Sequence, residues 1–155
     1  EARGFRLSVL GDYWQARQDL INLQIFLRLR KAGALVEEFK RFMVEPGVID
    51  SKQWIDNYHL PEANLAIILN NSPYENLLRG KEEIFKNLPF LESEIDDFLL
   101  DKIKKAKAIP LGIEPLVGYL LAKEREVMNL RLILSGKENK LPVETVRRRL
   151  RDVYI

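Results

Sequence analysis

Apolar residues recur along most of the chain at spacings of three, four and seven positions, which is the spacing of one face of an α-helix. The clearest stripe follows Pro115 and consists of Leu116, Leu120, Val127, Leu130 and Leu134. No segment alternates apolar and polar residues for long enough to predict a strand. The pattern therefore predicts an all-α protein, a helical bundle, with helices at 12–32, 34–44, 51–58, 61–70, 73–86, 89–107, 114–136 and 142–153.

Residues that favour helix starts stand where the apolar pattern begins. Asp50 can cap the helix expected from Ser51, because an aspartate side chain accepts a hydrogen bond from the first backbone N–H groups. Ser72 is followed by a proline, which suits the first helical position, and then by Glu75. Pro142 is followed by an acid in the same way. Short connections between such helices are typical of a compact bundle.

The chain resembles itself at an offset of 107 residues. Residues 19–27 fall on residues 126–134 without a gap, acid on acid and apolar on apolar, with Asn22 on Asn129. The match resumes in the next predicted helix, from Val36 onward. This period is much longer than that of ordinary solenoid repeats. It predicts that one helical unit is duplicated within a longer chain.

By this offset the first copy covers residues 1–112 and the start of a second copy covers residues 113–155. In each copy an acid and an asparagine stand three positions apart and therefore share a helix face. Two interpretations of these polar pairs are open. They could line a surface that meets a partner, or they could satisfy backbone groups of a neighbouring segment, which is the interpretation we favour.

Composition excludes several classes of protein. The chain has 155 residues, of which 46% are hydrophobic and 31% charged, so it has enough apolar surface to fold. It lacks cysteine, which excludes disulfides and thiolate chemistry. Its single histidine, His59, excludes a multi-histidine metal site and is expected at the surface. The glycines are scattered and form no phosphate-binding loop. We therefore expect no catalytic residue, no metal, no cofactor and no small-molecule substrate.

Charge is distributed unevenly. Residues 46–101 hold 11 acids and 4 bases, for a net charge of −7, whereas residues 102–155 hold 13 bases and 6 acids, for +7. The acidic run at 92–97 is expected to be a solvated helix face. The basic run at 147–151 could grip phosphates, but no series of stacking aromatics accompanies it, so nucleic-acid binding is the weaker interpretation. The apolar segment 116–134 carries five charges in its middle and is not expected to span a membrane.

Several segments together resemble one protein family. The main one is residues 114–137, with Glu-Pro-Leu-Val-Gly-Tyr-Leu-Leu at its start and Glu-Val-Met-Asn-Leu-Arg-Leu-Ile-Leu-Ser-Gly-Lys at its end. Also similar are residues 19–23 with the arginines that follow them, the Ser-Pro-Tyr turn at 72–74, and the segment 141–150. In order and spacing these segments resemble the C subunit of the archaeal and bacterial V-type (A-type) ATPase or ATP synthase, the relative of the eukaryotic V-ATPase d subunit.

The resemblance implies three pseudo-equivalent helical units, of which this chain would be the C-terminal portion. It implies a non-catalytic rotor subunit that joins the central stalk, made of the D and F subunits, to the membrane ring of proteolipid subunits. Such a protein transmits torque for ATP-coupled transport of protons or sodium ions, and it is a peripheral protein at the cytoplasmic face of the membrane. The chain would begin inside a longer protein, and a former interface exposed in this way could cause self-association.

The resemblance and the phase of the repeated helices also imply where a stalk would bind. The expected partner-binding residues are Asn22, Arg28, Glu124, Glu126, Asn129 and Arg131. The remaining alternatives are a helical adaptor with some other partner, which shares every feature derived from the residues themselves, and the basic-face nucleic-acid-binding protein.

Overall fold

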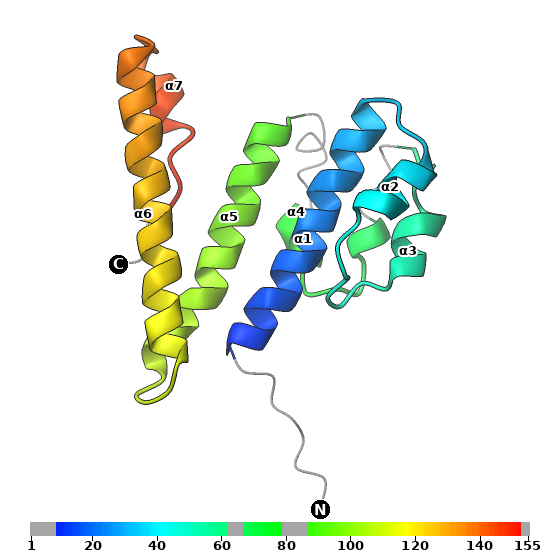
Figure 1. Cartoon of the computed structure of the whole chain (residues 1–155), viewed down its shortest axis with the longest axis horizontal. Helices are drawn as coiled ribbons and strands as arrows, with labels where there is room; N and C mark the ends of the chain where they lie inside the picture. The colour runs from blue at the N-terminus through cyan, green and yellow to red at the C-terminus, as the bar shows by residue number, and fades with distance from the viewer. Residues whose placement is uncertain (1–8, 62–66, 79–86, 153–155) are drawn as a thin grey trace, which may run out of the picture. The chain divides into compact units, whose positions relative to one another are not determined.

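A computed structural model describes residues 9–61, 67–78 and 87–152. Within these ranges the chain is helical or irregular and contains no strand, which confirms the predicted all-α class. The helices, labelled in Figure 1, are α1 (Val9–Lys31), α2 (Val36–Phe42), α3 (Ser51–Asp56), α4 (Glu75–Leu78), α5 (Leu88–Lys104), the 3₁₀ helix η3 (Lys105–Ala108), α6 (Glu114–Glu138) and α7 (Val143–Arg147).

The chain forms two compact units. The central unit is residues 14–95, and the terminal unit combines residues 1–13 with residues 96–155. The boundary that the repeat predicts at residue 112 is one of sequence similarity, and the division into compact units does not test it. The end of α5 and η3 precede that boundary, yet they fold with α6, which follows it.

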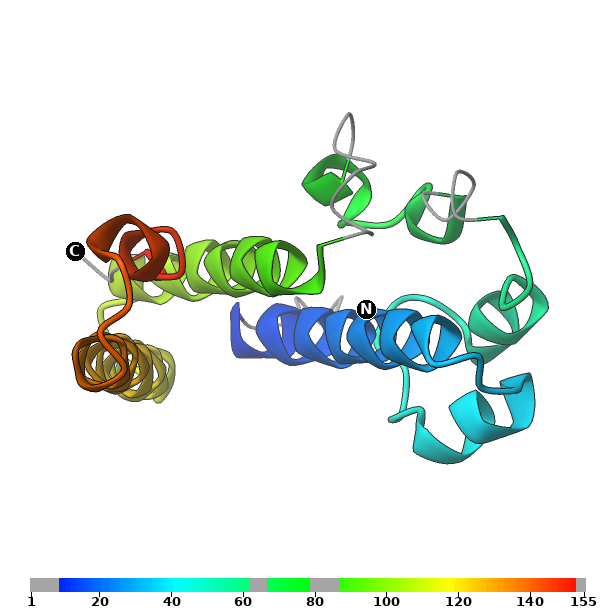
Figure 2. The same cartoon turned by 90° about the horizontal axis from the view of Figure 1, so that it is seen from above.

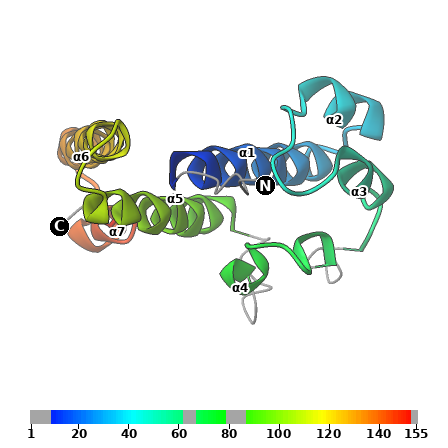
Figure 3. The same ribbon diagram turned by 90° about the horizontal axis from the view of Figure 1, so that it is seen from below.

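The core of the central unit is aromatic. Leu20, Leu23 and Phe26 of α1 are fully buried, because the apolar stripe of this helix turns inward. The ring of Phe26 meets the ring of Phe39 on α2 edge-on at a centroid distance of 5.3 Å. Trp54 on α3 completes the cluster, and its ring centroid lies 5.9 Å from that of Phe26. α2 and α3 contact each other and lie beside α1 (Figure 3).

Three of the predicted helix starts are confirmed. The Asp50 carboxylate accepts a hydrogen bond of 2.7 Å from the backbone N–H of Lys52 and so caps α3. The Ser72 hydroxyl accepts one of 3.2 Å from the N–H of Tyr74, just before α4. Pro115 lies in the first turn of α6, where its missing N–H costs nothing.

Two predicted helices are corrected or fall partly outside the described residues. In the segment 61–70, residues 67–69 form a 3₁₀ turn and not an α-helix, and residues 62–66 are outside the described ranges. In the segment 73–86, the helix described is the single turn α4, and residues 79–86 are again outside those ranges.

The expected helix over 142–153 is also too long, because α7 ends at Arg147. The physical reason is competition for backbone groups. The N–H and C=O of Arg151 are bound by the side chain of Asn129, and the N–H of Asp152 donates to the carboxylate of Asp97 at 3.0 Å. A backbone held by side chains of other helices cannot continue its own helical ladder.

The terminal unit is organised around α6. The chain turns back after η3, which contacts α6, and α7 then folds onto the C-terminal part of α6 (Figure 2). Small residues allow close approach: Ala106, Gly118, Ala122 and Gly136 are buried. Among the described residues, no helix is both long and apolar enough to cross a membrane.

Candidate partner-binding surfaces

Two asparagines of the predicted site hold the backbone inside their own units. Asn22 is fully buried; its amide donates to the C=O of Val44 at 3.1 Å and accepts from the N–H of Val44 at 2.9 Å. Asn129 makes the same two bonds, both of 3.0 Å, with the C=O and N–H of Arg151. In each case the residue held lies 22 positions further along the chain. The interpretation that these asparagines satisfy backbone groups is confirmed.

Asp19 organises the loop that follows α2. Its side chain is buried and accepts hydrogen bonds from the backbone N–H groups of Gly47 (2.8 Å) and Val48 (2.7 Å), with a longer one from Ile49 (3.3 Å). The hydroxyl of Tyr74 donates to the same carboxylate at 2.8 Å. Four donors compensate for the removal of this carboxylate from water.

Glu126 falls on Asp19 at the 107-residue offset and behaves differently. It is half-buried and accepts a hydrogen bond of 2.7 Å from the ammonium group of Lys123 on the same helix. This hydrogen bond raises the pKa of Lys123. The carboxylate therefore lies at the helix surface, where a partner can reach it.

The other three predicted residues are exposed. Arg28 is at the surface of the central unit and forms an ion pair with Glu92. Glu124 and Arg131 are exposed on α6 and, being seven positions apart, share one side of that helix. The structure thus separates the predicted site into two internal asparagines and four carboxylate or guanidinium groups at or near the surface.

The apolar stripe of α6 is exposed, which sequence periodicity alone does not reveal. Seven large apolar side chains of α6 are between 45% and 64% exposed. Met128 is on another side of the helix, and the other six lie along one side and define the α6 face: Leu116, Tyr119, Leu120, Val127, Leu130 and Leu134. The 107-residue offset places Val127, Leu130 and Leu134 on Leu20, Leu23 and Leu27 of α1, none of which is more than 6% exposed. The same stripe is covered in one unit and uncovered in the other.

The acidic run at 92–97 is not the solvated face expected from the sequence. Asp96 forms ion pairs with Arg151 at 2.9 Å and with Arg125 at 3.8 Å. Burial raises the pKa of Asp97, although a backbone hydrogen bond from Asp152 acts in the opposite direction. These half-buried carboxylates hold the segment after α7 against α5. The basic run at 147–151 is therefore not a continuous surface of unpaired cations, because Arg151 forms an ion pair with Asp96 within the terminal unit.

The described residues contain no cluster of histidine, aspartate and glutamate that could hold a metal ion. His59 is exposed, as expected, and its ring meets the ring of Tyr58 edge-on at 5.5 Å.

These features define a class: an all-helical protein that presents an apolar helix face flanked by charged groups, a surface typical of protein–protein contact. Comparison with known proteins specifies it further. The family model for the ATP synthase (C/AC39) subunit matches residues 3–149. The chain belongs to this family.

The names of individual relatives agree with this family. The chain is 29% identical over 143 residues to the C subunit of the A-type ATP synthase of Desulfurococcus sp. (strain SY), covering 90% of this chain and 38% of that protein. It is 33% identical over 150 residues to that of Methanococcoides burtonii, covering 92% and 41%.

The C subunit of a V-type sodium ATPase of Enterococcus hirae is 36% identical over 95 residues, covering 59% of this chain and 28% of that protein. The chain spans about two fifths or less of the length of these relatives. No solved structure matches the chain significantly.

Proposed function

We propose that this chain is part of a non-catalytic rotor subunit that links the central stalk of a V-type or A-type ATPase to its membrane ring of proteolipid subunits. In this role it transmits torque between ATP synthesis or hydrolysis and the transport of protons or sodium ions. It works at the cytoplasmic face of the membrane as a peripheral protein. Membership of the ATP synthase (C/AC39) subunit family supports this proposal, together with the names of the relatives.

The observation that carries the proposal is the exposed α6 face with its charged edge. Monomeric proteins rarely leave a contiguous apolar stripe in water unless it binds something. Glu124 and Arg131 lie along this stripe and provide charged groups of both signs. Apolar contact would supply most of the affinity, and the charges would set orientation and association rate. We assign the α6 face, with Glu124 and Arg131, to the D and F subunits of the stalk.

Torque transmission also requires each unit to be rigid, and hydrogen bonds from buried and half-buried side chains to loop backbone groups, here called ties, supply this rigidity. Asn22 and Asp19 bind backbone groups from four residues of the loop after α2, and Asn129 does the same for the segment after α7. Each tie fixes a loop to the middle of a long helix, so that the unit moves as one body under load. The shared offset of the two asparagines supports the proposed duplication of the helical unit.

The test is a calorimetric titration of a purified complex of the D and F stalk subunits with the chain and two charge-reversal variants. Arg131→Asp reverses a charge at the edge of the α6 face. Arg41→Asp, an exposed position on α2, is the matched control. We expect Arg131→Asp to weaken binding at least tenfold and Arg41→Asp to leave it unchanged, because only Arg131 lies beside the α6 face.

Circular dichroism melting of all three proteins separates folding from binding. Equal weakening by both substitutions would mean that only net charge matters, and it would contradict the assignment of the α6 face. A helical adaptor with a different partner remains the alternative function, and it predicts that the D–F complex does not bind at all.

A further inference from the structure

A cluster of lysines lies at the turn between α5 and α6. The basic link, residues 102–113, comprises the last residues of α5, the 3₁₀ helix η3 and the irregular residues 109–113 before α6. It contains four lysines and no acid. Figure 1 shows it as the turn that joins these two helices. The positive charge of the chain is therefore concentrated at one end of this helix pair.

The burial pattern of the basic link exposes its lysines. Ile103 and Ala106 are buried, and η3 contacts α6, so the link is fixed to the terminal unit. Lys105 and Lys107 stand on either side of Ala106 and are both exposed. Because neighbouring residues of a short helix alternate in this way between core and solvent, packing of the apolar residues places the two ammonium groups at the surface.

The lysines of the link differ in their surroundings. Lys104 forms an ion pair of 2.9 Å with Asp152. Burial and the nearby ammonium group of Lys105 lower the pKa of Lys102, while the carboxylate of Asp12 on α1 acts in the opposite direction. Repulsion between two ammonium groups is relieved when a negative charge comes close. The link is therefore an electropositive surface that favours an anionic partner.

Two large apolar side chains of the same link are in water. Leu111 is 87% exposed and Ile113 is 63% exposed. Gly112 stands between them with a φ of +134°, a conformation that suits glycine and lets the chain turn into α6. Single exposed apolar residues are common on protein surfaces. Here, however, two of them follow directly after a cluster of lysines.

This combination suits an anionic bilayer surface better than another protein. A stable protein interface takes about 20–30 residues from each partner, whereas the whole link has twelve residues and buries some of them. Binding to a bilayer surface needs less. Each lysine near anionic headgroups strengthens binding on the order of fivefold, and apolar side chains add affinity by entering the boundary between headgroups and acyl chains.

We propose that the basic link is a binding surface for anionic lipid headgroups. Lys102, Lys105 and Lys107 attract the phosphate groups of the lipids, and Leu111 and Ile113 enter the bilayer interface. This inference goes beyond the proposed function, which concerns the stalk and the proteolipid ring, and it does not depend on that function.

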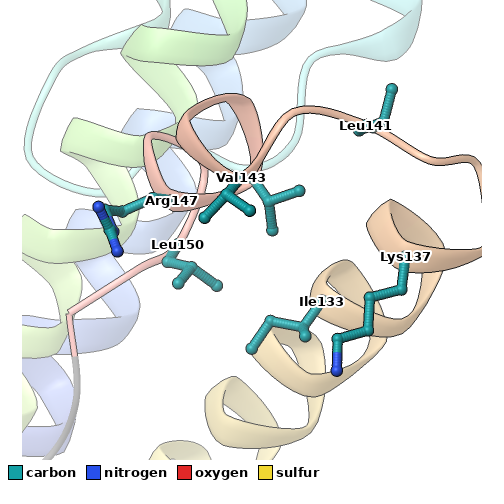
Figure 4. A pocket seen from close by; sticks show the side chains of 7 residues that line it. Ile133, Lys137, Leu141, Val143, Arg147 and Leu150 are labelled. Carbon is teal, nitrogen blue, oxygen red and sulfur yellow. The ribbon is translucent and has the colours of Figure 1, made fainter.

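Cations also border apolar side chains at the pocket between α6 and α7. Figure 4 shows Lys137 and Arg147 there, among apolar side chains such as Ile133 and Leu150. The two places differ, because these apolar side chains line a hollow, and Arg147 forms an ion pair of 2.9 Å with Glu144. Charge reversal at Lys137 and Arg147 is therefore a matched control for charge reversal in the basic link.

The probe is a set of vesicles, made of phosphatidylcholine alone or with roughly 30% phosphatidylglycerol, and flotation measures how much of the whole chain they bind. We expect affinity for the anionic vesicles to be at least tenfold higher than for the neutral vesicles. It should fall as the concentration of NaCl rises from about 0.05 M to about 0.5 M, because salt screens the attraction.

Two double variants locate the charge. Lys105→Glu/Lys107→Glu should reduce affinity for the anionic vesicles at least tenfold. Lys137→Glu/Arg147→Glu changes the net charge equally and should leave the affinity nearly unchanged. All four positions are exposed, and circular dichroism melting of both variants shows whether they fold as the unsubstituted chain does.

A pair of leucine variants tests insertion into the bilayer interface. Leu111→Ser should reduce affinity for the anionic vesicles roughly fivefold, because a leucine side chain is no longer withdrawn from water. Leu35→Ser removes another exposed leucine, 67% exposed and just before α2, and should have no effect. Binding that is unchanged in Leu111→Ser would contradict the proposal.

Equal binding to neutral and anionic vesicles, or binding to neither, would overturn the proposal. Equal losses in the two double variants would also overturn it, because net charge alone would then explain the binding. Polyglutamate covers the other class of partner. If polyglutamate binds, Lys105→Glu/Lys107→Glu abolishes that binding, and anionic vesicles do not bind, the basic link is a site for an acidic protein and not for lipid.

Discussion

Asn22 and Asn129 make the same pair of backbone hydrogen bonds, each with a residue 22 positions further along the chain. Removing either amide leaves one N–H and one C=O without a partner. Because Asn22 is fully buried, Asn22→Ala should lower the free energy of unfolding by about 2–4 kcal/mol. Asn129 is half-buried, so Asn129→Ala should cost about 1–2 kcal/mol.

Urea denaturation followed by two probes checks this prediction. Both tryptophans, Trp14 and Trp54, belong to the central unit, so their fluorescence reports on that unit, whereas far-ultraviolet circular dichroism reports on all helices. Asn22→Ala should shift the fluorescence transition more than Asn129→Ala does. An equal shift of the fluorescence transition in both variants would contradict the claim that each asparagine stabilises only its own unit.

Gly47 has no room for a side chain. A Cβ atom at this position would lie 2.2 Å from the backbone carbonyl oxygen of Gln15, and it would push the loop away from the carboxylate of Asp19. We expect Gly47→Ala to destabilise the central unit by about 2–3 kcal/mol, through overpacking and a weakened hydrogen bond. Thermal melting monitored by tryptophan fluorescence measures this loss.

Gly33→Ala is the control for Gly47→Ala in this thermal melting experiment. It has a φ of +73°, and a Cβ atom added there would have nothing within 4 Å. Gly33→Ala therefore meets only the conformational cost of a left-handed residue, about 1–2 kcal/mol. Equal destabilisation by the two substitutions would mean that contact with α1 does not constrain Gly47.

Asp97 makes stability depend on pH. Burial raises the pKa of this carboxyl above its usual 3.8, so the folded state holds the proton more tightly than the unfolded state does. Its contribution to stability is therefore greatest below pH 3.8 and is lost as the pH rises through the higher folded pKa. Asp97→Asn retains an oxygen that can accept a hydrogen bond from the N–H of Asp152. Because the amide does not titrate, the variant does not lose stability in this way as the pH rises.

The measurement for Asp97 is urea denaturation of both proteins at several pH values. The stability of Asp97→Asn relative to the unsubstituted chain should increase between about pH 3 and pH 6. Taking the difference between the two proteins cancels the titration of all other carboxylates. A difference that stays constant, or that decreases with pH, would refute the raised pKa.

The exposed α6 face should also cause self-association of the isolated chain. Burial of apolar area between two copies is favourable by about 25 cal/mol for each Å², so sedimentation should show dimers whose proportion rises with concentration. Leu130→Lys should disperse them, whereas Leu111→Lys, an 87% exposed position outside α6, should not. Dimers that persist in Leu130→Lys would place the contact elsewhere on the chain.

Local patterns in the sequence predict where several helices begin. The cap of Asp50 and the proline start of α6 follow from short-range chemistry, and both are found in the structure. The length of α7 could not be predicted in this way, since it ends where Asn129 captures the backbone of Arg151 from a distant part of the chain. Competition of this kind is visible only once the helices are placed together.

The candidate binding surface shows the same limit of prediction from sequence. Periodicity identifies the apolar stripe of α6, but it cannot tell whether the stripe is covered, and the equivalent stripes of α1 and α6 differ in this respect. The pairing of Asp96 with Arg151 was likewise hidden, because an acidic run usually indicates a solvated helix face. The repeat offset, in contrast, gave the positions of both asparagines from the sequence itself.

A titration that compares two lengths of chain tests whether this chain binds the central stalk through α6. A purified D–F complex is titrated with this chain and with a chain extended at its N-terminus, both from the same source. We expect sub-micromolar binding by both chains, with the affinity reduced at least tenfold when Leu130 is replaced by lysine. Binding by the extended chain alone, or by neither chain, would contradict the assignment of the α6 face to the stalk.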